Sequence, residues 1–210
     1  MEIPSTHENP SYLIHSHSYE DRMNPGLWCK HLLEGIKVNL RIMEKDDLTL
    51  LAEYENDANF WGELAVYPLL QRSKADQEKE YDKRSPEENW FFIEKKDGTK
   101  VGAAFHFPNG RMLEIGYALI PGERRKGYGT EAAKIIVDYL FLSKDIVRIQ
   151  ATTDVRNTVS QKVLEKIGFK KEGIIRKYVF VSGEWRDALL YSILREEWKE
   201  PKILTRKTSE

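Results

Sequence analysis

The sequence is poor in cysteine, has no long apolar run and carries almost no net charge. Cys29 is the single cysteine in 210 residues, so no disulfide forms within the chain, which is typical of a reducing cytoplasm. No apolar stretch approaches the roughly 18 residues of a membrane span, and no signal-peptide pattern opens the chain. The formal net charge of −1 does not indicate nucleic acid or an anionic membrane as a partner. We therefore expect a cytoplasmic protein with neither partner.

The hydrophobic pattern predicts one α/β domain with a segment on each side. Residues 1–34 are irregular and hold four of the five histidines, and residues 199–210 form a basic tail. Residues 35–198 form the expected domain, with a central sheet of about seven strands and about four helices. The strands are expected at 36–43, 89–95, 99–107, 111–120, 146–153, 174–181 and 184–194, and the helices at 46–56, 71–85, 130–142 and 157–167.

Residues 121–130 carry the clearest functional signal. They join an apolar strand-like run to an amphipathic helix-like run. Gly127 and Gly129 let the backbone turn tightly and expose its N–H groups, and the helix start adds unpaired donors and a positive dipole end. The composition therefore predicts an anion-binding site rather than a charged surface turn. Three side chains add positive charge at the same place: Arg124, Arg125 and Lys126.

The glycine loop does not match the common nucleotide-binding motifs. No Gly-Lys-Ser/Thr closes it, and it has no third glycine of the dinucleotide fingerprint. It resembles the pyrophosphate loop of the GNAT acyl-CoA N-acyltransferases, written Arg/Gln-x-x-Gly-x-Gly/Ala, in which Arg124, Gly127 and Gly129 fill the pattern.

A second segment makes the resemblance more specific. Asn157 is followed by Ser160 and by Glu165-Lys-Ile-Gly-Phe169, in the order that GNAT members carry. Glu172-Gly173 and the stretch 183–187 resemble the RimJ/RimL branch, which acetylates protein N-termini and other amines. The likeness runs from about residue 35 to residue 198.

The resemblance implies a mostly antiparallel sheet with one splayed strand pair, acetyl-CoA as cosubstrate and no metal. The pyrophosphate of coenzyme A would lie on the glycine loop, and the pantetheine arm against the strand before it. Asn157 would bond the arm from the other side or simply cap its helix. The residues expected to bind the coenzyme are Ala118, Leu119, Ile120, Arg124, Arg125, Lys126, Gly127, Tyr128, Gly129, Thr130, Asn157 and Ser160.

Acetyl transfer needs a neutral amine and a proton for the departing thiolate. An α-amino group has a pKa of ~8 and lysine ~10.4, so a neutral lysine costs roughly 3 kcal/mol more near pH 7. Glu114 is the expected base, acting through water, unless it is an ordinary solvated strand charge. It shares a strand face with Gly116 and Ala118, which leave a gap for a substrate.

The expected proton donor departs from the commoner family pattern. Many members have a tyrosine seven residues after the asparagine, where this sequence has Leu164. Ser160 is expected to take that role directly or through a water, as the RimJ/RimL resemblance implies. The other interpretation of Ser160 is routine helix capping.

The resemblance predicts direct acetyl transfer to a peptide N-terminal amine, with several alternatives open. Polyamine or aminoglycoside acetylation is the second choice, and a non-catalytic acyl-CoA module and an interaction protein are the others. Residues 56–71 are expected to shape the acceptor site, and a homodimer is possible. Residues 1–34 are expected to pack on the domain or on a second subunit. His7, His15, His17 and His31 show no recognised metal-binding spacing.

Overall fold

The computed structural model describes residues 33–66 and 71–199. The expectations for Cys29, the four N-terminal histidines, the N-terminal segment before Leu33 and the tail after residue 199 lie outside these residues. The described residues belong to one compact unit, His31–Glu210. The predicted division of the chain at residues 34 and 199 stays a prediction.

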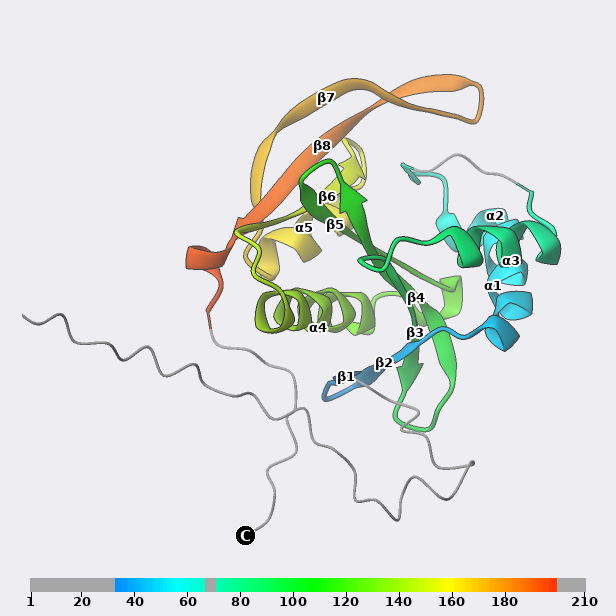
Figure 1. Cartoon of the computed structure of the whole chain (residues 1–210). Coiled ribbons are helices and arrows are strands. Elements are labelled where there is room, and N and C mark those ends of the chain that lie inside the picture. The colour runs from blue at the N-terminus through cyan, green and yellow to red at the C-terminus, as the bar shows by residue number, and fades with distance from the viewer. Residues whose placement is uncertain (1–32, 67–70, 200–210) are drawn as a thin grey trace, which may run out of the picture. The chain divides into compact units, whose positions relative to one another are not determined.

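The described residues form one mixed sheet of eight strands in the order β1-β2-β3-β4-β5-β6-β8-β7, with every neighbouring pair antiparallel except β5 and β6 (Figure 1). This confirms the predicted fold class. The strand that the sequence did not predict is β1. Its two residues are too few to show the alternation that is typical of a strand. The strands are β1 (Leu33–Glu34), β2 (Val38–Ile42), β3 (Asn89–Lys95), β4 (Lys100–Asn109), β5 (Met112–Leu119), β6 (Arg148–Asp154), β7 (Lys170–Val181) and β8 (Glu184–Leu194).

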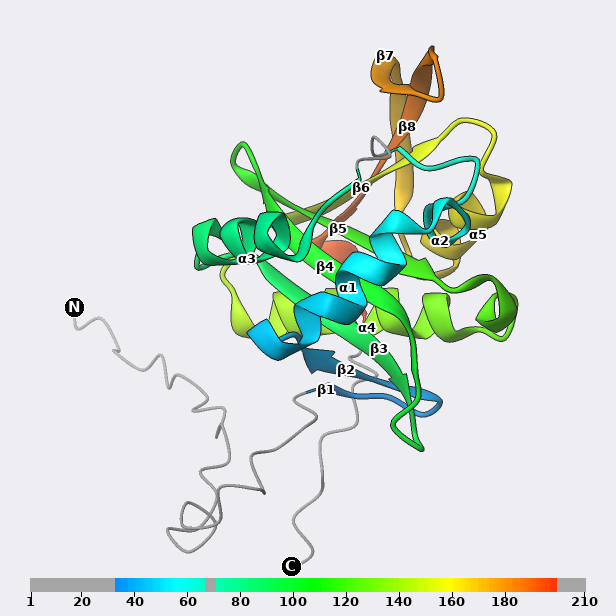
Figure 2. The same ribbon diagram turned by 90° about the vertical axis from the view of Figure 1, so that its right-hand side faces the viewer.

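Five α-helices lie in the described part of the chain, on both faces of the sheet (Figures 1 and 2). The sequence predicted four, because α2 is a single turn and shows no helical period. The helices are α1 (Leu48–Asn56), α2 (Ala58–Trp61), α3 (Lys74–Lys83), α4 (Tyr128–Ser143) and α5 (Thr158–Lys166), with short 3-10 turns at Lys45–Asp47, Pro121–Glu123 and Arg195–Glu197.

The parallel pair β5 and β6 separates soon after it forms. Its Cα partners are Leu113 with Ile149 and Glu114 with Gln150 only, whereas β5 pairs with β4 along its whole length. The sheet is therefore open between the later halves of β5 and β6, which confirms the expected splayed pair. Backbone groups of β5 that face this opening have no strand partner there.

The two faces of the sheet have separate apolar clusters. Helix α4 is amphipathic, as expected, and presents an apolar stripe in which Ala132, Ile135, Ile136 and Leu140 are buried and Tyr139 is partly buried. Helices α1–α3 cover the other face, where the buried residues are Met43, Leu48, Leu51, Phe60, Phe92, Ala103 and Ala118.

Helix α5 ends in a glycine motif. Gly168 has a φ of 102°, the N–H of Phe169 bonds the carbonyl of Leu164 (3.0 Å), and the N–H of Gly168 bonds the carbonyl of Glu165 (3.1 Å). These two bonds form a Schellman motif, and Phe169 is buried beyond it.

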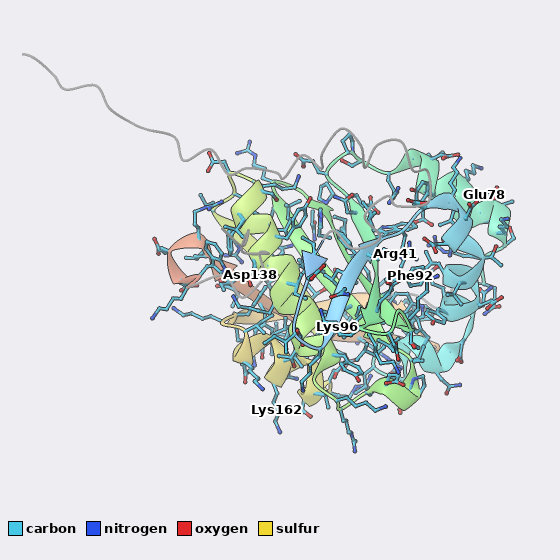
Figure 3. The ribbon with its side chains drawn as sticks, turned by 90° about the horizontal axis from the view of Figure 1, so that it is seen from below. Arg41, Glu78, Phe92, Lys96, Asp138 and Lys162 are labelled. Atoms are coloured by element: carbon cyan, nitrogen blue, oxygen red, sulfur yellow. The ribbon has the colours of Figure 1, made fainter. Side chains whose placement is uncertain are left out.

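Asp47 directly precedes α1, but its carboxylate makes no capping hydrogen bond with that helix. It accepts two hydrogen bonds of 2.8 Å from Arg41, which lies over the ring of Phe92 on the next strand (Figure 3). Burial favours the neutral acid, but the bonds from Arg41 lower the pKa of Asp47 to about 2.

Candidate active site

The glycine loop before α4 exposes a set of backbone N–H groups. Arg125 and Gly127 both have left-handed φ values, 64° and 87°, which bend the loop into a concave turn. The first helical bond of α4 runs from the N–H of Glu131 to the carbonyl of Gly127 (3.1 Å). The N–H groups of Tyr128, Gly129 and Thr130 precede that bond and have no partner within the helix. This geometry suits a phosphate group.

The three basic side chains of the loop do different things. Arg124 donates to the backbone carbonyls of Leu119 (3.0 Å), Asn59 and Phe60, so its charge ties the loop to α2. Lys126 pairs with Glu123 at 2.9 Å. Arg125 is exposed and makes no ion pair within the described residues. The loop therefore offers backbone donors, with Arg125 as its least engaged cation.

Only part of the predicted pantetheine-binding strand faces the opening. The N–H of Ile120 bonds the carbonyl of Val101 in β4 (3.0 Å), and backbone groups along a strand alternate in direction. The backbone of Ala118 therefore also faces β4, whereas Leu119 and Tyr117 face the side where β6 has splayed away. Leu119 is the member of the predicted trio whose N–H points into the opening.

The start of α5 brings Asn157, Ser160 and Tyr117 together. Asn157 accepts the N–H of Ser160 through its side-chain oxygen (3.0 Å), so the capping interpretation is confirmed and its amide nitrogen stays available. The buried hydroxyl of Tyr117 lies beside Ser160 but makes no hydrogen bond of ordinary geometry within the described chain. Burial raises the pKa of Tyr117 to about 12, so the hydroxyl keeps its proton. Leu164 is buried and offers no donor.

Sequence reasoning missed Tyr117 as a site residue. It looks like an ordinary core position, because its side chain packs on the α4 side of the sheet. The one signal in the sequence was its position directly before Ala118, the first residue predicted to bind the pantetheine arm.

Glu114 is fully buried, so its interpretation as a solvated strand charge is wrong. Its carboxylate accepts hydrogen bonds from Asn109 (2.7 Å), Gln150 (3.0 Å) and Thr152 (2.6 Å). The predicted gap at Gly116 is also wrong, since a Cβ atom there would overlap the ring of Phe105. The buried carboxylate is held rigidly at the point where β5 and β6 begin to separate.

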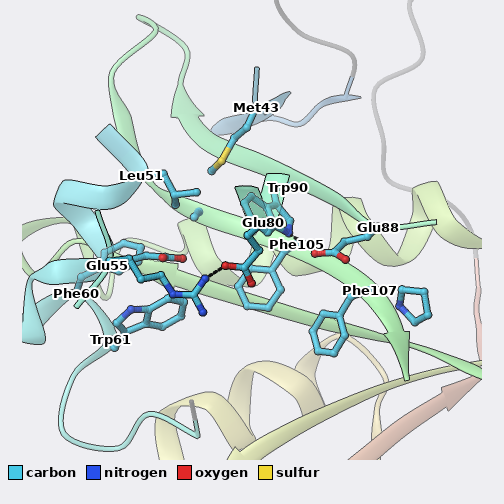
Figure 4. A pocket seen from close by; sticks show the side chains of 14 residues that line it. Met43, Leu51, Glu55, Phe60, Trp61, Glu80, Glu88, Trp90, Phe105 and Phe107 are labelled. Atoms are coloured by element: carbon cyan, nitrogen blue, oxygen red, sulfur yellow. Dashed lines mark hydrogen bonds and ion pairs between the residues drawn. The ribbon is translucent and has the colours of Figure 1, made fainter. Parts of the chain in front are cut away.

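A cavity of about 340 Å³ lies on the α1–α3 face of the sheet (Figure 4). Strand register pairs Phe107 with Glu114 and Phe105 with Gly116, so its aromatic wall borders the buried carboxylate. Residues 56–71, predicted to shape an acceptor site, contribute Phe60 and Trp61, while residues 67–70 lie outside the described chain. The cavity lining is Met43, Leu51, Glu55, Phe60, Trp61, Arg72, Glu80, Glu88, Trp90, Ala103, Ala104, Phe105, Phe107 and Pro108.

The cavity is both aromatic and acidic. Glu55 accepts the side-chain amide of Gln77, and burial raises the pKa of Glu55. Glu88 accepts the indole N–H of Trp90 at 2.7 Å, and Glu80 pairs with Arg72 (Figure 4). The cavity lining thus contains three carboxylates and one guanidinium, and aromatic faces attract cations as well.

Residues 33–66 and 71–199 lack two further features. No helix there is long and apolar enough to cross a membrane. No three His, Cys, Asp or Glu side chains gather there in a way that would hold a metal ion.

The comparisons with known proteins agree with this geometry. The family model described as the acetyltransferase (GNAT) domain matches residues 37–170. The chain belongs to the GNAT acetyltransferase family. An uncharacterized N-acetyltransferase, p20 of Bacillus licheniformis, is 32% identical over 170 residues, which are 77% of this chain and 95% of the relative. The uncharacterized N-acetyltransferase YnaD of Bacillus subtilis is 41% identical, but its match spans only half of the relative's length.

Relatives and neighbours with different acceptors match this chain. The spermidine N(1)-acetyltransferase of Escherichia coli K12 is 26% identical, with 77% of this chain and 88% of the relative covered. A GNAT acetyltransferase structure from Bacillus anthracis has a TM-score of 0.67 at 28% identity and covers 79% of this chain and 99% of its own. A coenzyme A complex of RimL, the ribosomal L7/L12 α-N-protein acetyltransferase, has a TM-score of 0.66 at 16% identity. It covers 75% of this chain and 94% of its own, and at this identity it supports the fold alone.

Proposed function

We propose that this N-acetyltransferase moves an acetyl group from acetyl-CoA directly to a cationic primary amine held in the acidic aromatic cavity. The observation that carries the proposal is the arrangement around β5. Phosphate donors and the open strand edge lie beside α4 and α5, whereas the cavity borders Glu114 on the α1–α3 face. The two reactants would meet in the opening between β5 and β6.

The cavity supports an acceptor that carries a second positive charge, as polyamines do. Its surplus of carboxylates and its aromatic walls suit a methylene chain that ends in an ammonium group. The similarity to a spermidine N(1)-acetyltransferase, which covers 77% of this chain and 88% of the relative, supports the same class.

A peptide N-terminus, as in the RimJ/RimL branch, is the second candidate acceptor. The β7–β8 hairpin projects from the sheet and carries Phe180 and Trp185, both exposed, with ring centroids 5.6 Å apart (Figure 1). An acceptor larger than the cavity would use such a surface.

When bound, acetyl-CoA supplies an activated thioester, so the remaining chemistry concerns protons and orientation. Among the described residues, Oε1 of Glu114 has Thr152 as its one donor, which leaves a lone pair for a water. That water would take the proton of the amine and pass its own proton to the Glu114 carboxylate. The N–H of Leu119 is in position to stabilise the negative charge that develops on the thioester oxygen. As the new C–N bond forms and the C–S bond breaks, Ser160 beside Tyr117 donates a hydrogen bond to the leaving sulfur.

Thiol release from acetyl-CoA tests the proposal, with spermidine, an N-terminal peptide and an aminoglycoside as acceptors. Spermidine is expected to give the largest kcat/KM and to yield acetylspermidine by mass spectrometry. A preference for the peptide would mean that the acceptor is a peptide N-terminus, and the protein would still be an N-acetyltransferase. Coenzyme A binding without turnover of any amine would favour the non-catalytic module. A cytoplasmic location, a homodimer and the lack of nucleic-acid and membrane partners stay predictions.

A further inference from the structure

Lys37, far from the glycine loop in sequence, reaches it in the fold. It lies in the turn between β1 and β2, and its Nζ donates to the carbonyl of Lys126 at 3.3 Å. A Cβ atom on Gly127 would lie 3.3 Å from the same nitrogen. The ammonium group therefore sits beside the loop whose N–H groups suit a phosphate.

Glu131, in the first turn of α4, holds the β1–β2 turn in this place. Its carboxylate accepts the N–H of Lys37 (2.9 and 3.1 Å to its two oxygens) and that of Ile36. Gly35 allows the close approach, because a Cβ atom there would overlap the Glu131 carboxylate. The backbone of Gly35, Ile36 and Lys37 thus lies against the carboxylate of Glu131.

The charges around the loop are incompletely balanced by the protein. Lys126 has Glu123 as its partner, whereas Lys37 and Arg125 make no ion pair within the described residues. The Glu131 carboxylate is engaged by backbone N–H groups of the turn. The Lys37 ammonium group and the free N–H groups at the start of α4 therefore lie close to one another, where an anion would balance their charge.

We propose that Lys37 binds the pyrophosphate of coenzyme A together with the backbone N–H groups of residues 128–130, and that Glu131 is the positioning residue for it. This inference rests on the proposed function, because it takes the glycine loop as the coenzyme site. It adds a cation from outside the loop motif, carried by a turn that α4 holds in place.

Calorimetry with coenzyme A and with dephospho-coenzyme A tests this role, since both ligands keep the pyrophosphate. Lys37→Gln is expected to raise the Kd of both ligands by about three- to tenfold, the range for a charged hydrogen bond at an exposed site. Lys37→Arg should keep most of the affinity, because it keeps the charge. Glu131→Ala, which leaves Lys37 intact but frees its turn, should weaken both ligands in the same direction.

Lys45→Gln is the matched control, because it removes one exposed positive charge at the other end of β2. Its coenzyme affinity should equal that of the wild type, and the melting temperature of Lys37→Gln should be unchanged. An unaltered Kd for Lys37→Gln, or a loss confined to coenzyme A and absent with dephospho-coenzyme A, overturns the assignment. If the wild type binds neither ligand, the proposed function fails as well, so the two failures are distinguishable.

Discussion

The glycine loop and the aromatic cavity differ in how the chain builds them. The proposed loop site is one contiguous stretch that offers backbone N–H groups, and Lys37 reaches this stretch from a distant turn. The cavity draws side chains from α1, α2, α3, β3 and β4, and nothing in its lining forms a continuous motif. A site made of backbone groups can be predicted from residues that are neighbours in sequence. A site made of side chains forms only when the helices and strands have packed together.

The two sites also differ in charge and lie on opposite sides of β5. Tyr117 and Leu119 pack with the helix side where the cationic loop begins, and Glu114 and Ala118 turn toward the acidic cavity side. In the proposed function, one strand therefore separates a positive site for a polyanion from a negative site for an amine. If this separation is correct, substitutions on one side should leave binding on the other side unchanged.

The largest expected effect comes from Gly127→Glu. Gly127 has a φ of 87°, and a glutamate there adds left-handed strain and a negative charge beside the phosphate donors. We expect the Kd for coenzyme A to rise by about a hundredfold or more, a change on the order of 3 kcal/mol. Calorimetry measures it.

Gly98→Glu is the control for Gly127→Glu, since Gly98 has a similar φ of 84° with no neighbouring atom within 4 Å of a Cβ. Equal loss of coenzyme binding in both variants would mean that general backbone strain, and not the loop site, is responsible.

Glu114→Gln tests the proposed base, which lies where β5 and β6 begin to separate. A glutamine at this position places its own N–H donor against one of the donors from Asn109, Gln150 and Thr152. One buried hydrogen bond is therefore lost, which lowers the free energy of unfolding by about 1–3 kcal/mol. We expect kcat to fall by about a hundredfold while coenzyme affinity is kept. Thr152→Val separates the effects, because it removes one donor and leaves the carboxylate. A Glu114→Gln variant with wild-type kcat between pH 6 and 9 would place the base elsewhere.

Ser160→Ala should affect the chemical step more than binding. Its hydroxyl is needed only as the sulfur departs, so kcat is expected to fall about tenfold with little change in the KM for acetyl-CoA. Asn157 still caps α5 through the backbone N–H of residue 160, so the fold is retained. A variant that changes KM alone would show that Ser160 binds the coenzyme and takes no part in proton transfer.

Glu55→Gln should weaken the amine and leave the coenzyme alone. Removing one half-buried carboxylate is expected to raise the KM for spermidine about three- to tenfold. Because burial raises the pKa of Glu55, the wild type should lose spermidine affinity as the pH falls through that raised pKa, and the variant should lose less. Glu53→Gln, an exposed glutamate on the same helix, is the control. An equal pH dependence in both variants would remove Glu55 from the acceptor site.

The smallest effect is expected between two N-terminal deletions, one of residues 1–34 and one of residues 1–32. Deleting residues 1–34 removes β1 and buried Leu33, worth about 2 kcal/mol, and loosens the turn that carries Lys37. We expect about a twofold rise in the Kd for coenzyme A and a lower melting temperature, relative to a deletion of residues 1–32. Identical behaviour of the two truncations would show that β1 does not support the turn.

Signals that act within a few residues were sufficient for much of the fold. The stripe on α4, the Schellman end of α5 at Gly168 and the left-handed turn at Gly127 were all predictable, because each depends on neighbouring residues along one element. The splayed pair followed from the family resemblance and not from any local pattern.

Only the tertiary structure decided what the side chains of the site contact. It buried Glu114 among three donors, filled the expected gap at Gly116 with Phe105, and turned Arg124 toward the carbonyls of α2. It also brought Lys37 to the loop. The physical reason is that these contacts join residues far apart in sequence, and no periodicity or turn preference records which distant side chains will meet. Backbone geometry is a local property of the chain, whereas the pairing of side chains depends on how whole strands and helices pack.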